Sequence, residues 1–110
     1  MYTTMELTKS GSLFSMMSTI LMLREEGYTF DFRKEPDCIY CLELGVWIMP
    51  HEFNIDRCFH FEEVGFPDED RVLLAISAFE NVKGLLVDTF GVYSDNTSVE
   101  LARKFEKHKL

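Results

Sequence analysis

Residues 71–93 read RVLLAISAFENVKGLLVDTFGVY, and this stretch decides the fold. Two apolar runs flank the short link Glu80-Asn81-Val82, a pattern typical of a β-hairpin. Within the runs, residues 72–76 and 84–87 do not alternate between apolar and polar side chains. Unbroken apolar runs indicate strands that are covered on both faces. The sequence therefore predicts a central hairpin in a larger sheet.

Three segments before this hairpin also have strand character. Residues 28–33 alternate, with aromatic side chains at every second position, and residues 57–63 alternate in the same way. Residues 38–49 are typical of a second strand or of a bent pair of strands, with Gly45 as an expected bulge. Residues 51–56 are expected to form a connection. Short links between these segments favour antiparallel pairing.

Helices are predicted at both ends of the sheet. Ser12 is a suitable N-cap for a helix that runs to Glu26, and Gly27 suits the left-handed residue beyond its C-terminus. This first helix is apolar over more than half of its circumference, which is more than one sheet face requires. Near the end of the chain, Thr97 and Glu100 match the spacing of a capping box.

The expected fold is therefore α+β: a mainly antiparallel four- to five-stranded sheet with an N-terminal and a C-terminal helix. Residues 1–11 show no period and are predicted to be a flexible extension, and residues 12–110 a single domain. The chain has 110 residues, which leaves no room for a second independent core.

The charge of the chain restricts its partners. With 19 acidic and 11 basic residues, the net charge is −8. Such a field repels phosphate backbones and anionic headgroups, so neither nucleic acid nor membrane is an expected partner. The apolar stretch Leu13–Leu23 lacks a basic leader, and it is shorter than the roughly 20 residues that span a bilayer. We expect a cytoplasmic protein.

The sharpest local motif is Cys38-Ile39-Tyr40-Cys41, which could hold a metal together with Cys58 and His60. In a regular strand, positions 38 and 41 point to opposite faces, so convergence would need a turn. A redox pair would favour a helix directly after the motif, and none is expected there. We therefore expect no metal and no cofactor; if a metal is bound, these four side chains are the candidate ligands.

Asp88 and Tyr93 are the candidate ligand-binding residues. Asp88 follows a buried apolar run, so its carboxylate needs a partner. That partner is either a neighbouring strand or loop, or a small-molecule ligand bound near Tyr93.

Several stretches resemble a family of small bacterial proteins that are often labelled phosphoribosylpyrophosphate synthetase. The resemblance covers roughly residues 16–108, and it is carried by Glu26–Phe32, Pro36–Cys41, Phe53–Asp56, Val82–Asp88 and Gly91–Tyr93. The family label implies binding of ATP, magnesium and ribose 5-phosphate, followed by transfer of a diphosphate. Such an activity needs a glycine-rich loop of amides around the phosphates. The nearest stretch, Val87–Gly91, has one acid and a bulky Phe90, so no catalytic residue is carried over.

Three hypotheses of function follow. The first is a non-catalytic binding or regulatory module that self-associates through the Leu13–Leu23 helix or a sheet edge. The second is a metal-binding domain that uses Cys38 and Cys41. The third is a small enzyme acting on sugar phosphates or nucleotides, as the family label implies.

Overall fold

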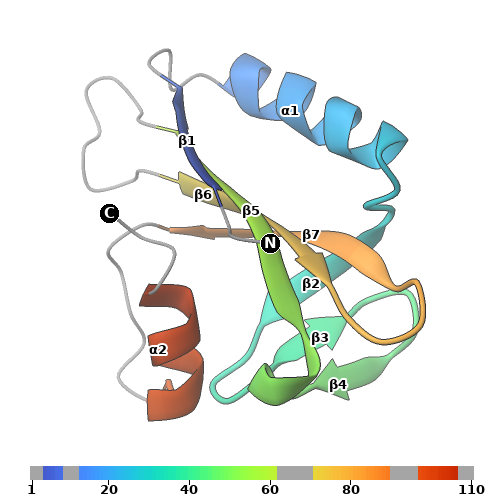
Figure 1. The fold of residues 1–110 in the computed structure, drawn as a ribbon, viewed down its shortest axis with the longest axis vertical. Helices are drawn as coiled ribbons and strands as arrows, with labels where there is room; N and C mark the ends of the chain where they lie inside the picture. The colour runs from blue at the N-terminus through green and yellow to red at the C-terminus, as the bar shows by residue number, and fades with distance from the viewer. Residues whose placement is uncertain (1–3, 9–12, 62–70, 90–96, 107–110) are drawn as a thin grey trace.

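The computed structural model describes residues 4–8, 13–61, 71–89 and 97–106. The fold is α+β, as the sequence predicted, and two helices lie on either side of a sheet (Figure 1). The elements are β1 (Thr4–Thr8), α1 (Leu13–Glu25), β2 (Phe30–Lys34), β3 (Ile39–Cys41), β4 (Val46–Ile48), the 3₁₀ turn η1 (Pro50–Glu52), β5 (Asn54–Phe61), β6 (Arg71–Ser77), β7 (Lys83–Thr89) and α2 (Val99–Glu106).

The sheet has seven strands in the order β1-β5-β6-β7-β2-β3-β4. The pairs β1–β5 and β2–β7 are parallel, and the other neighbouring pairs are antiparallel. The sheet is thus mixed, and the prediction of four to five strands was too low. The central hairpin was predicted correctly as β6 and β7, whose turn places Glu80 and Asn81 at positive φ.

Two segments account for the additional strands. The predicted flexible extension over residues 1–11 missed β1, which pairs with β5 from Thr4 to Thr8. Residues 38–49 form the bent pair β3–β4, and Gly45 lies in their turn at φ +66° rather than in a bulge. The bulge occurs instead at Asp56, inside β5, where the sequence predicted a connection.

Two buried clusters pack on opposite faces of the sheet, and β6 contributes to both. Leu73 and Ala75 face the side of α1, whereas Leu74 and Ile76 face the side of α2. Because alternate residues of a strand point to opposite faces, a strand between two layers is apolar at every position. The unbroken apolar run of β6 has this cause.

Both helices end or begin with recognisable caps. At the C-terminus of α1, Gly27 has φ +103°, its N–H donates to the Arg24 carbonyl, and the Tyr28 N–H donates to the Leu23 carbonyl. This pattern is a Schellman motif, which satisfies carbonyls at the helix end. Neither helix in the described part of the chain is long and apolar enough to cross a membrane.

The cap of α2 differs from the predicted one by a single residue. Ser98, not Thr97, caps the helix, because its Oγ accepts a hydrogen bond from the Leu101 N–H at 3.2 Å. The Ser98 N–H in turn donates to the Pro36 carbonyl at 2.7 Å, which ties the start of α2 to the loop after β2.

Candidate functional site

The candidate site is a hollow where β2 leaves β7. The two strands pair only at Phe30 with Gly84 and at Asp31 with Leu85; from Phe32 onward, β2 pairs with β3. Gly84 allows this close approach, because a Cβ there would overlap the Phe30 carbonyl group and lie 2.8 Å from the Phe32 ring. Beyond this crossing the strands diverge and leave an opening beside α1.

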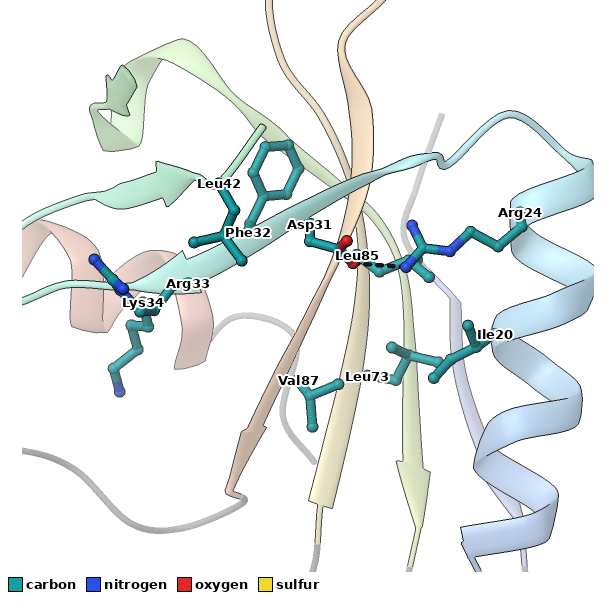
Figure 2. Close-up of a pocket in the computed structure, with 10 residues that line it drawn as sticks. All are labelled: Ile20, Arg24, Asp31, Phe32, Arg33, Lys34, Leu42, Leu73, Leu85 and Val87. Carbon is teal, nitrogen blue, oxygen red and sulfur yellow. Dashed lines mark hydrogen bonds and ion pairs between the residues drawn. The ribbon is translucent and has the colours of Figure 1, made fainter. Parts of the chain in front are cut away.

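We call this hollow the α1–β2 groove (Figure 2). Its volume is about 410 Å³, which falls within the range of small-molecule sites. The apolar side chains of Ile20, Leu73, Leu85 and Val87 gather on one side, and Leu42 reaches in from the end of β3. The remaining lining residues are Arg24, Asp31, Phe32, Arg33 and Lys34.

Arg24 spans the groove from α1 to β2 (Figure 2). Its Nη2 lies 2.6 Å from Asp31 Oδ1, and its Nη1 donates to the Tyr28 and Phe30 carbonyls at 3.0 and 3.2 Å. The hydrogen bond from Arg24 is the main cause that lowers the pKa of Asp31. Asp31 is therefore ionised at neutral pH, and it positions Arg24 rather than exchanging a proton.

The other cations beside the groove also face carboxylates. Arg33 Nε lies 2.7 Å from Glu35 Oε2, and Lys34 directs its Nζ to the other face of the sheet, 3.4 Å from Asp88 Oδ2. Pairing of this kind cancels most of the local positive charge. The described residues thus give the groove apolar walls and paired charges, with no cluster of cations among them for a phosphate.

The sequence left two kinds of partner open for Asp88, and in the structure its partner is Lys34 on the neighbouring strand β2. It follows Val87 in β7 and therefore points to the opposite face, that of α2, where Lys34 approaches it. The Lys34 ammonium group also lies 5.7 Å from the centre of the Phe105 ring on α2. Tyr93, the other predicted ligand-binding residue, lies outside the described residues.

The candidate metal ligands are buried. Cys38, Cys41 and Cys58 form no disulfide with one another, and His60 lies in β5 opposite Val72. Burial is the main cause that raises the pKa of Cys38 to about 11, and Asp37 adds to it. Within the described ranges, no group of three or more His, Cys, Asp or Glu side chains could hold a metal ion.

A polar cluster that the sequence did not reveal lies at the bulge of β5. Asp56 accepts hydrogen bonds from Tyr28 Oη at 2.9 Å and from Ser77 Oγ at 3.0 Å. Burial, followed by the hydrogen bond to Asp56, raises the pKa of Tyr28 to about 12. The phenol stays protonated and donates, so this cluster fastens the end of α1 to β5 and β6. The position of the bulge was the missing signal, because Asp56 is the extra residue that it inserts into β5.

A row of one cationic and two aromatic side chains crosses β2, β3 and β4 on the groove side of the sheet. Arg33, Tyr40 and Trp47 are directly opposite one another in the strand register. The Arg33 guanidinium lies 4.9 Å from the Tyr40 ring centre, and the Tyr40 and Trp47 rings are 5.0 Å apart. Trp47 is 63% exposed. The row extends the surface of the groove toward the edge strand β4.

Comparison with protein families, with curated proteins and with solved structures found no match for this chain. Its function must therefore be inferred from the groove and the surfaces around it.

Proposed function

We propose that this protein is a small non-catalytic binding module and that its binding surface is the α1–β2 groove. The observation that carries the proposal is an open hollow with apolar walls, at the point where β2 leaves β7. Concave, mainly apolar hollows with a few fixed polar groups are where proteins bind ligands.

The chemistry of the lining supports binding rather than catalysis. General acid–base catalysis works best with a group whose pKa is close to the working pH. The pKa of Asp31 is lowered, whereas the raised pKa values of Tyr28 and Cys38 belong to groups that do not line the groove. Arg24 has its guanidinium occupied by Asp31 and by two carbonyls.

The expected occupant is apolar. Leu42 and Val87 beside the groove are 50% and 48% exposed, so an apolar group placed there would remove their surface from water. An anionic occupant is disfavoured, because the chain carries a net charge of −8 and the neighbouring cations are already paired.

The proposal is tested with the uncharged fluorescent probe N-phenyl-1-naphthylamine, whose emission rises in apolar surroundings. We expect saturable binding to the wild-type chain, and weakening by about tenfold or more in Val87→Lys, because an ammonium group would be placed in the groove. Val99→Lys is the matched control, since Val99 is exposed on α2. Absence of binding over the whole range of protein concentration, or equal loss in both variants, would refute the proposal.

A further inference from the structure

The first element of this inference is a stripe along α1. Met17, Ile20, Leu21 and Arg24 are spaced i, i+3, i+4 and i+7, so they lie on one side of the helix. Ile20 and Arg24 line the groove, whereas Met17 and Leu21 are 60% and 67% exposed. An apolar surface therefore continues from the wall of the groove to the outside of α1, and we call its exposed part, formed by Met17 and Leu21, the helix flank.

The second element is the ribbon formed by β2, β3 and β4. On the face directed toward α2, Ile39, Cys41 and Ile48 have no exposed surface, and Val46 is partly buried. The face on the groove side carries Leu42, Tyr40 and Trp47 instead. Among the described residues, α1 packs on β5, β6 and β7 of this face, and the ribbon beside it is left open.

We propose that a second copy of this chain occupies the α1–β2 groove, with α1 of each copy lying along the groove and ribbon of the other. In the described part of each chain, the apolar helix flank is exposed, and it lies on the same side of the sheet as the open groove. A two-fold axis pairs both at once and leaves neither surface open. This inference rests on the proposed function, because it names the occupant of the same groove.

The distribution of charge favours a second copy over a partner of opposite charge. Residues 13–23 carry no charged side chain, so two chains of net charge −8 could meet there without opposing like charges at close range. Asp31, which lines the groove, already pairs with Arg24, and Glu35 pairs with Arg33. Glu43 beside them accepts a hydrogen bond from the Asp31 N–H at 2.9 Å. The paired carboxylates offer little to a basic partner, whereas the uncharged residues 13–23 of a second α1 need no opposite charge to meet them.

Sedimentation velocity over a range of concentrations tests the inference. We expect the wild-type chain and Val99→Lys to be dimeric at high micromolar concentration. Leu21→Lys alters only the helix flank and Val87→Lys only the groove, and each should raise the dissociation constant by about tenfold or more. Circular dichroism is used to check that both variants are folded.

Mixing the two variants gives the sharper result. A Leu21→Lys chain keeps an intact groove, and a Val87→Lys chain keeps an intact helix flank. Their heterodimer therefore retains one unaltered half of the interface, whereas each variant alone retains none. We expect the mixture of folded variants to associate more strongly than either variant by itself. No gain on mixing would refute the exchange of helices.

The outcomes separate this inference from the proposed function. A wild-type chain that stays monomeric at high micromolar concentration, or a dimer that neither variant weakens, overturns the inference. In either case probe binding that Val87→Lys removes would leave the proposed function intact. If the inference holds, Leu21→Lys binds more probe per chain than the wild type, because its groove is freed. A monomeric Leu21→Lys chain that binds no probe would instead overturn the proposed function.

Discussion

Gly84 of β7 lies against the carbonyl group of Phe30 of β2 so closely that a Cβ at residue 84 would overlap it. The obstacle is backbone, which cannot rotate away as a side chain can. The two strands pair at this crossing and diverge after the next pair, Asp31 with Leu85. The same contact thus holds the strands together and sets the position of the groove.

Gly84→Ala is expected to destabilise the protein by about 2 kcal/mol or more, because β2 must move away from β7. Gly45→Ala provides a comparison. Its new Cβ would have space, with Tyr40 Oη 3.6 Å away, but φ is +66° and the cost should be about 1 kcal/mol. Urea unfolding measures the free energy of unfolding of both variants. A smaller loss in Gly84→Ala than in Gly45→Ala would show that the backbone contact between Gly84 and Phe30 is not as close as described.

The groove could not be predicted from the sequence, although much of the sheet could. The run Val72–Ile76 indicates a strand covered on both faces wherever it lies, because each of its side chains is apolar. Residues 4–8 alternate between polar and apolar side chains, but this strand signal is only five residues long and was missed; these residues form β1, which pairs with β5. The divergence of β2 from β7 depends on a contact between Gly84 and Phe30, which are far apart in the chain. Local periodicity contains no information about such a contact.

The ion pair across the groove should make part of the stability depend on pH. Arg24 lowers the pKa of Asp31 from its ordinary value of 3.8 in the folded state. A lowered folded-state pKa gives stability that is present above the unfolded pKa and is lost as the pH falls through the folded one. Asp31→Asn should therefore be less stable than the wild type at neutral pH, by about 1 kcal/mol or less because both side chains are partly exposed.

The difference in free energy of unfolding between the wild type and Asp31→Asn should shrink once the pH is below the folded pKa of Asp31. Urea unfolding at neutral and at strongly acidic pH measures this difference. A difference that stays constant across this range would mean that the charge of Asp31 does not stabilise the fold.

The Tyr28–Asp56–Ser77 cluster should behave as one unit. Tyr28→Phe and Ser77→Ala each remove one hydrogen bond to Asp56, at a cost of about 1–2 kcal/mol. Since the remaining donor compensates in part, the double variant should lose more than the sum of the single losses. Strictly additive losses in a double-mutant cycle would show that the two donors act independently.

The raised pKa of Tyr28 also predicts that the protein becomes less stable at alkaline pH. Its pKa is raised from 10.0 to about 12, so its stabilising effect is fully present below pH 10.0 and is lost as the pH rises toward 12. In Tyr28→Phe this contribution is absent. The difference in free energy of unfolding between the wild type and Tyr28→Phe should therefore narrow over this interval. Unfolding measured at several alkaline pH values tests this, and a constant difference would contradict it.

The three cysteines should be unreactive in the native protein. Each is buried, and burial raises the pKa of Cys38 to about 11, which keeps this thiol protonated at neutral pH. Iodoacetamide should therefore modify none of the cysteines in the native state and all of them in denaturant, as measured by mass spectrometry. Rapid native labelling of Cys38 would contradict its burial beside Asp37.

We expect no synthesis of phosphoribosyl pyrophosphate from ATP, magnesium and ribose 5-phosphate. Asp88 carries the only acidic side chain within Val87–Gly91, the stretch nearest to a phosphate-binding loop. It is engaged by Lys34 at 3.4 Å, on the face opposite the groove. The neighbouring cations Arg24 and Arg33 are paired as well, and the chain as a whole repels anions. Product formation above a blank, lost in Asp88→Asn, would place an active site beside Lys34.

Asp88→Asn should lower the free energy of unfolding by about 1 kcal/mol, because the partly buried ion pair with Lys34 is lost. Probe binding in the groove should stay unchanged in this variant, because Asp88 lies on the opposite face of the sheet.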